Sequence, residues 1–296
     1  MKKRLLVGLG ILVASLVILL GGARLASAAR ESASHEVASA DVPLPADPAS
    51  LAEGERLFVS RGCGGGDCHQ ADGGGHVMMS DGAFGTIVAS NLTTIARDLS
   101  AQDWDRAVRH GVRRDGRSLV FMPSGDFVAM PDRELGLIAA YARTLPGVER
   151  DLPPTSPGML ARVLDLAGAV ELFPAGHIDH AAVAAPDAEP GRTVEHGAYL
   201  ARLCTGCHGM QLSGGPIPGA PAELGNPRNL TFDETGLAGW SEQDFVRSMR
   251  EGVTPDGATL DRRQMPWPDL SRMTDDELGA IYLYLQTVPH VAEGNR

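Results

Sequence analysis

An internal repeat constrains the fold of this chain more than any other feature. The tripeptide Asn-Leu-Thr occurs at 91–93 and again at 229–231, and the dipeptide Met-Pro occurs at 122–123 and again at 265–266. Between and after these segments, Ser-x-x-Asp, Gly-Val, Asp-Gly and Glu-Leu-Gly recur in the same order in both copies. Two copies of one unit of roughly 100 residues therefore account for most of the chain, which predicts two similar domains in tandem.

Each copy contains two cysteines followed by a histidine. In the second copy, Cys204, Cys207 and His208 have the C-x-x-C-H spacing of a covalent haem c attachment site. The two thiols add across the vinyl groups of the porphyrin, and the adjacent imidazole binds the iron. A zinc site made from these residues lacks a fourth ligand, and a redox disulfide has no use for the histidine. We therefore predict that Cys204, Cys207 and His208 bind a haem.

The first copy has a longer spacing between its cysteines. Four residues separate Cys63 from Cys68, and His69 follows directly. The glycines at 64–66 lack a β-carbon and tolerate positive φ, so the extra residues can bulge while both sulfurs reach the porphyrin. We predict a second haem c on Cys63, Cys68 and His69. A strained local disulfide and attachment through Cys68 alone are the alternatives at this motif.

The order of these elements carries a family resemblance. Each copy has its haem motif near the start, Met-Pro further along and an amphipathic helix at the end. Each copy thereby resembles a class I cytochrome c domain, and the pair resembles the cytochrome subunits of periplasmic alcohol and sugar-acid dehydrogenases. The resemblance covers about residues 51–148 and 188–292. It implies an all-α fold with two tandem class I cytochrome c domains.

The second axial ligand decides the chemistry at each iron. Cytochrome c domains place a methionine in the loop before the last helix, so the resemblance implies Met122 opposite His69 and Met265 opposite His208 as iron ligands. A methionine sulfur gives six-coordinate iron and raises its reduction potential. For the first iron, competing ligands are His76, Met78, Met79 and His110, whereas Met130 and Met273 are interpreted as packing residues.

Two further sets of residues are interpreted as surroundings of the haems. Trp104, Trp240 and Trp267 are expected either to donate indole hydrogen bonds to the propionates or to pack against the haem edge. The side chains of Asn91 and Asn229 are expected to bind a nearby backbone group or a propionate, and Asn-Leu-Thr is also an ordinary turn sequence.

The first 29 residues are an export segment. Basic residues at 2–4 precede an apolar run from Leu5 to about Ala23, and the small residues at 26–29 offer an A-x-A cleavage site. The run is long for a signal-peptide core and just long enough to span a bilayer. We predict a signal peptide or a membrane anchor, preceding a protein on the periplasmic side of the bacterial inner membrane, because the positive end stays inside.

The remaining segments connect these parts. Residues 30–50 mix Ala, Ser, Glu and Pro, which predicts a flexible tether. After a proline-rich break, the apolar stretch from Met159 to Phe173 has helical periodicity. The predicted divisions are 1–29 signal peptide or anchor, 30–50 tether, 51–148 cytochrome c domain 1, 149–187 linker with a short helix, and 188–292 cytochrome c domain 2.

Charge and motif content limit the function. The formal net charge is −11, with 26 basic and 37 acidic residues and no long basic run, which excludes nucleic acid as a partner. We expect a dihaem electron carrier rather than an enzyme, in the form of a dehydrogenase subunit or a similar carrier. Its donor and acceptor would be a dehydrogenase, a quinol-oxidising complex, another cytochrome or a terminal oxidase. The alternative is a dihaem cytochrome c peroxidase or a thiosulfate-oxidising enzyme, which needs an open or displaceable axial ligand.

Overall fold

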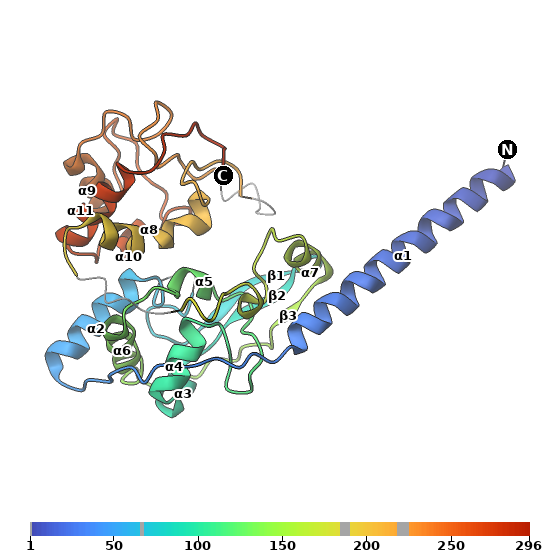
Figure 1. The fold of residues 1–296 in the computed structure, drawn as a ribbon, viewed down its shortest axis with the longest axis horizontal. Coiled ribbons are helices and arrows are strands. Elements are labelled where there is room, and N and C mark those ends of the chain that lie inside the picture. Colours follow the sequence, from blue (N-terminus) through green and yellow to red (C-terminus); the bar gives the residue numbers. More distant parts are fainter. Residues whose placement is uncertain (1, 66–67, 184–189, 218–224) are drawn as a thin grey trace.

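The computed structural model describes residues 2–65, 68–183, 190–217 and 225–296 and consists of a projecting N-terminal helix and two helical units (Figure 1). Helix α1 (Lys2–Ser32) extends away from the rest of the molecule. By length and composition, its segment Leu6–Ser32 is able to cross a membrane, and its most apolar stretch is exposed. The apolar helix expected at the N-terminus is therefore present.

The first unit is organised by two crossing helices, α2 (Pro48–Ser60) and α6 (Asp132–Ala142). Their contact passes through Gly54, where a β-carbon would lie 2.3 Å from the carbonyl oxygen of Leu137. Glycine is needed here because two helix backbones touch. The chain between them forms α3 (Leu92–Ile95), a 3-10 turn at Ala96–Asp98, α4 (Ala101–Val108) and α5 (Ser124–Phe127).

The second unit repeats this arrangement. Helices α8 (Val194–His208) and α11 (Asp275–Leu285) cross at Gly197, where a β-carbon would lie 1.9 Å from the carbonyl oxygen of Ala280. Between them lie α9 (Glu242–Glu251) and α10 (Trp267–Leu270). Capping boxes begin α4 at Ser100 and α9 at Ser241, as their Ser-x-x-Asp sequences predict.

The all-α prediction is wrong in the first unit, which contains a small antiparallel sheet in the order β1-β2-β3. Strands β1 (His76–Asp81) and β2 (Gly85–Ala89) form a hairpin, and β3 (Ser156–Pro157) pairs with β2. The Asp81 carboxylate closes the turn by accepting the N–H groups of Ala83 and Phe84. The β-branched residues at 86–88 favour a strand, and Ile87 is buried.

A second, smaller hydrophobic cluster lies behind this sheet. It joins Phe84 and Ile87 of the hairpin with Ala161 of α7 (Met159–Leu166) and with Leu172 and Phe173, just before the 3-10 turn Pro174–Gly176. Helix α7 also packs against α1. The short helix expected after residue 149 is thus present, and it contacts α1 and the sheet. The linker expected up to residue 187 lies partly outside the described residues.

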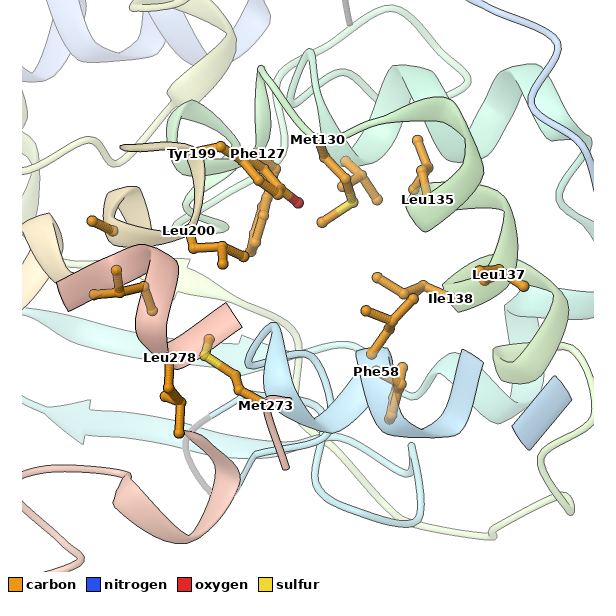
Figure 2. Packing of buried hydrophobic residues seen from close by; sticks show 14 of the residues in the cluster. Phe58, Phe127, Met130, Leu135, Leu137, Ile138, Tyr199, Leu200, Met273 and Leu278 are labelled. Atoms are coloured by element: carbon orange, nitrogen blue, oxygen red, sulfur yellow. The ribbon is translucent and has the colours of Figure 1, made fainter. Parts of the chain in front are cut away.

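The main hydrophobic core continues from one unit into the other. Figure 2 shows Phe127 of α5 beside Tyr199 and Leu200 of α8, and all three are buried. Phe58 and Ile138 fill the α2–α6 crossing of the first unit. The two units therefore meet through a packed apolar contact.

Residues 33–47, within the predicted flexible tether, run along the first unit. The N–H of His35 donates to the carbonyl of Gly116 (2.8 Å), and the N–H of Ala40 donates to the Asp105 carboxylate (2.7 Å). Val42 is only 2% exposed. The structure differs from the prediction here because one apolar side chain and two backbone donors contact the neighbouring surface, which a composition-based argument does not detect.

Candidate functional site

The two motif histidines make the same hydrogen bond. Nδ1 of His69 lies 2.7 Å from the carbonyl oxygen of Ser90, and Nδ1 of His208 lies 2.7 Å from that of Arg228. A carbonyl only accepts, so Nδ1 carries the proton in each ring and Nε2 holds the lone pair. Burial lowers the pKa of both imidazoles, which keeps them neutral at pH 7. Each ring is thereby oriented to offer Nε2 to a metal.

The Asn-Leu-Thr repeats hold these carbonyls in place. The Asn91 amide donates to the carbonyl of Val148 (2.8 Å), and the Asn229 amide donates to that of Val291 (2.7 Å). Their side-chain oxygens accept the N–H groups of Thr93 and Thr231. Of the two roles expected for these asparagines, the structure shows the backbone one. Each asparagine thus hydrogen-bonds the loop that contacts its histidine to the C-terminal end of its own unit.

Sequence reasoning missed the two carbonyls that orient the histidines. Ser90 and Arg228 have different side chains because only their backbone is used. The available signal was their position, since both stand directly before Asn-Leu-Thr. A backbone contact of this kind leaves no trace in residue type.

The second motif opens onto an apolar cavity. His208 and Met265 both line a cavity of about 330 Å³, together with Leu237, Trp240 and Phe245. The structure thus brings the two predicted ligands of the second iron to one site. Cys204 is half-buried and Cys207 is exposed, one turn of α8 apart and next to His208. Burial, with the neighbouring Cys207 and Asp126, raises the pKa of the Cys204 thiol to about 12.

In the first motif, backbone hydrogen bonds bridge the longer spacing between the cysteines. The N–H of His69 donates to the carbonyl of Cys63 (3.0 Å), and the N–H of Gly64 donates to that of Phe58 (2.8 Å). Burial, with the nearby Cys68, raises the pKa of the Cys63 thiol to about 12. Gly64 does not use the positive φ that glycine tolerates. A β-carbon there would instead lie 2.6 Å from the Phe58 ring, so glycine supplies space. Gly66 and Asp67 lie outside the described residues.

Met122 lies at the end of a strained segment. The preceding residue, Phe121, has φ +64°, which is unfavourable for an aromatic residue. Its N–H donates to the carbonyl of Leu172 (2.9 Å), and its ring meets that of Phe84 edge to face. Such strain persists only where surrounding contacts enforce it, and it concentrates at functional positions. Met122 itself is half-buried against the main core.

The competing ligands have other surroundings. Met78 and Met79 pack against the small cluster behind the sheet, and Nδ1 of His110 lies 3.1 Å from Nδ1 of His180. Met130 and Met273 are buried at 1% and 2% exposure, as expected of packing residues. The fourth competitor, His76, lies close enough to His69 to lower the pKa of that imidazole, and its own buried Nδ1 has no hydrogen-bond partner among the described residues, so Met122 and His76 both stay candidate partners of His69.

The tryptophans differ in their hydrogen bonding. The Trp267 indole donates to the carbonyl of Leu260 (3.2 Å), which accounts for its N–H without a haem. The indole N–H of Trp104 is buried and has no partner among the described residues. A buried donor of this kind is costly unless a bound group accepts from it. At the second site, neutral His208, Met265, the two cysteines and the cavity fit haem c. At the first site, the unpartnered Trp104 indole is consistent with an acceptor group nearby.

Comparison with known families identifies the second unit. Residues 194–289 match the family model named Cytochrome c. This part of the chain is therefore similar to cytochrome c domains. The match begins with α8 and ends after α11, so it contains Cys204, Cys207, His208 and Met265.

The similar curated proteins are cytochrome subunits of dehydrogenases. The chain is 29% identical to the cytochrome c subunit of quinone alcohol dehydrogenase from Gluconacetobacter polyoxogenes, over 72% of this chain and 50% of that protein. It is 25% identical to the fructose dehydrogenase cytochrome subunit of Gluconobacter japonicus, over 86% and 56%. It is 26% identical to the gluconate 2-dehydrogenase cytochrome c subunit of Pantoea cypripedii, over 82% and 60%.

The chain therefore spans 50–60% of the length of these relatives. All three are named as cytochrome subunits of dehydrogenases, which does not favour the alternative of a dihaem peroxidase or a thiosulfate-oxidising enzyme.

Proposed function

We propose that this chain is a dihaem c-type cytochrome with two tandem cytochrome c domains, which carries electrons as a subunit of a membrane-associated dehydrogenase. The observation that supports it most directly is the repeated histidine geometry, in which Nδ1 of His69 and of His208 is bound to a backbone carbonyl at the same distance of 2.7 Å. Two unrelated histidines have no reason to share this arrangement. The dehydrogenase relatives supply the class of donor.

The residues of the chain have distinct roles in this function. Cys63 with Cys68, and Cys204 with Cys207, hold the two haems by thioether bonds. His69 with Met122, and His208 with Met265, would bind the two irons. A bound haem c supplies an iron that accepts and releases one electron. Apolar side chains such as Leu237 and Phe245 line the cavity and exclude water from it, and methionine ligands would favour electron transfer over reaction with a substrate.

Haem content and ligation test this proposal. Purified protein is expected to contain two c-type haems per chain in a pyridine haemochrome assay, and the double change Cys63→Ala/Cys68→Ala should leave one. Met122→Ala and Met265→Ala should each remove half of the methionine–iron absorption in the near infrared. Met78→Ala is the matched control, because Met78 is half-buried against the other cluster. A single haem in the unaltered protein, or equal effects of Met78→Ala and Met122→Ala, would contradict the assignment.

We further propose that α1 is an uncleaved membrane anchor. The A-x-A segment lies within the helix, and Ser27 is fully buried, accepting a hydrogen bond from Arg162 of α7 (2.9 Å). Beyond it, Arg30 pairs with the buried Asp165 (2.8 Å), and Glu31 pairs with Arg162 (2.9 Å). Cleavage near Ala28 would remove Ser27 from this contact. The apolar run of residues 5–23 spans about 28 Å as a helix, close to the bilayer core of about 30 Å.

The mass of the purified protein decides between anchor and signal peptide. We expect the intact N-terminus in the membrane fraction, resistant to extraction by high salt and released by detergent. A mature protein that begins after residue 28 or 29 in a salt-soluble periplasmic fraction would refute the anchor while leaving the haem assignment untouched.

A further inference from the structure

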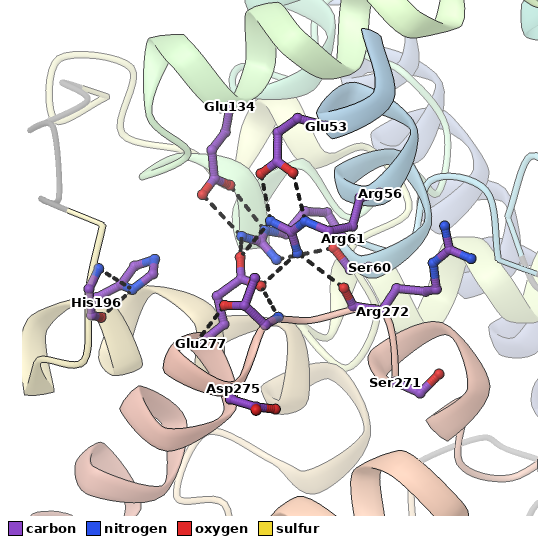
Figure 3. Close-up of polar contacts among 12 residues, drawn as sticks. Glu53, Arg56, Ser60, Arg61, Glu134, His196, Ser271, Arg272, Asp275 and Glu277 are labelled. Atoms are coloured by element: carbon purple, nitrogen blue, oxygen red, sulfur yellow. Dashed lines mark hydrogen bonds and ion pairs between the residues drawn. The ribbon is translucent and has the colours of Figure 1, made fainter. Parts of the chain in front are cut away.

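Two glutamates at equivalent places in the repeat meet at the junction of the two units. Glu134 in α6 and Glu277 in α11 are both the first residue of the recurring Glu-Leu-Gly segment. Their carboxylates converge on one guanidinium, that of Arg61 at the end of α2 (Figure 3). Arg61 Nε and Nη2 lie 3.0 Å from the two oxygens of Glu134, and Nη2 lies 2.5 Å from Glu277 Oε1.

The contacts around these glutamates are exchanged between the units in a quasi-symmetric way. Arg56 of the first unit reaches Glu277 of the second (2.7 Å), and Tyr199 of the second unit donates to Glu134 of the first (2.8 Å). Arg56 and Tyr199 are themselves equivalent, because each stands two residues after the glycine of its helix crossing. The two units are therefore related by an approximate twofold arrangement. Of the residues named here, only Arg61 has no equivalent from the other unit, and it lies between the two.

Arg61 is the most deeply buried charge of this junction. Its side chain is 1% exposed, and those of Glu134 and Glu277 are 12% and 7% exposed. Burial alone would raise the pKa of Glu277, but Arg61 and Arg56 outweigh it and hold this pKa at about 2. A buried charge that loses its partner is strongly unfavourable. A shift of one unit against the other would therefore break these ion pairs. Because the charged groups are buried, water would not take the place of the lost partners.

The junction also sets where the haem motifs lie. Helix α5 follows Met122-Pro123 directly and contacts α8, where Arg202 donates to the carbonyl of Gly125 (2.8 Å) two residues before Cys204. In the reciprocal contact, α10 follows Met265-Pro266 and packs against α2. There a β-carbon on Gly65 of the first motif would lie 2.6 Å from the Asp269 carboxylate. The methionine loop of each unit thus abuts the cysteine motif of the other.

From this arrangement we infer that Arg61 is a positioning residue, which holds the two haem motifs at one fixed separation for electron exchange between them. The inference rests on the proposed dihaem function. The step it serves moves one electron from the ferrous iron of one haem to the ferric iron of the other, so that one is oxidised, the other is reduced, and no bond or proton changes place. Arg61, Glu134 and Glu277 contribute the geometry of this step and touch neither iron.

The test compares Arg61→Met and Arg61→Lys with Arg117→Met in the intact detergent-solubilised protein. Arg117 is a matched control, because it is a half-exposed arginine whose pairing with Asp115 stays within one loop. The readouts are haem content, the methionine–iron band, the magnetic coupling between the two ferric haems by electron paramagnetic resonance, and the rate of electron exchange between the haems after rapid partial photoreduction.

We expect Arg61→Met to keep both haems and both methionine ligands but to slow exchange severalfold, because the rate of electron transfer falls steeply as the separation between donor and acceptor grows. The coupling between the haems should weaken in parallel, Arg61→Lys should recover part of both, and Arg117→Met should change neither. If Arg61→Met does not accumulate, Glu277→Gln removes one of its two partners and should give a smaller loss of the same kind.

Unchanged exchange and coupling in a two-haem Arg61→Met protein would overturn the inference and leave the proposed function standing. Fewer than two haems in the unaltered protein would instead overturn the proposed function.

Discussion

Replacing Gly197 by alanine should destabilise the second unit, because its helix crossing has no room for a methyl group. The added β-carbon would lie 1.9 Å from the carbonyl oxygen of Ala280, and relaxing it to 3.0 Å requires α8 and α11 to separate by about 1 Å. Overpacking usually costs about 1–3 kcal/mol, and an overlap with backbone on this scale belongs at the upper end. Alanine in a helix gains about 1 kcal/mol over glycine. The net loss is therefore about 2 kcal/mol.

The assay is equilibrium unfolding of the full chain in detergent, followed by far-ultraviolet circular dichroism. Gly206→Ala is the matched control in the same helix, since a β-carbon there meets nothing within 4 Å. It should stabilise by about 0.5–1 kcal/mol through helix propensity alone. Gly54→Ala, with a contact of 2.3 Å to Leu137, should fall between the two. Equal midpoints for Gly197→Ala and Gly206→Ala would refute the close-approach reasoning.

Three other properties follow from single side chains. Because Arg61 and Arg56 hold the pKa of Glu277 at about 2, below its ordinary 4.5, the stability it contributes is complete above pH 4.5 and is lost as the pH falls toward 2. Acid should therefore lower the unfolding midpoint of Glu277→Gln less than that of the unaltered protein, and parallel curves would contradict this. Burial and then Glu171 raise the pKa of Asp126 to about 6, so its ionisation costs stability as the pH rises from 3.8 through 6. Asp126→Asn should raise the unfolding midpoint at pH 8 but not at pH 4, and an equal gain at both would contradict it. Ile87→Ala, at a side chain 1% exposed, should cost about 2–5 kcal/mol and speed amide exchange first in the β1–β2 hairpin, whereas uniform acceleration throughout the first unit would argue against a separate small cluster.

Local signals in the sequence were sufficient for several elements. The capping boxes at Ser100 and Ser241 begin α4 and α9 as predicted, because a cap is made by residues three positions apart. The C-x-x-C-H spacing identified the second motif for the same reason, and the family match of residues 194–289 agrees with it. In contrast, the hairpin at 76–89 was missed. Its β-branched residues and Asp-Gly turn favour a hairpin, whereas the resemblance implies helices alone.

The sequence by itself determined the repeat, the candidate haem ligands and the apolar N-terminal helix, because each is encoded in residue types at short spacings. Only the tertiary structure decided which residues form the contact between the two repeats. Arg61 belongs to none of the recurring segments of the sequence, yet it bridges Glu134 and Glu277, which are 73 and 216 residues away. Its partners depend on how two folded units meet, and no short-range pattern records that. The same holds for the carbonyls of Ser90 and Arg228, whose backbone contacts orient His69 and His208 whatever their side chains are.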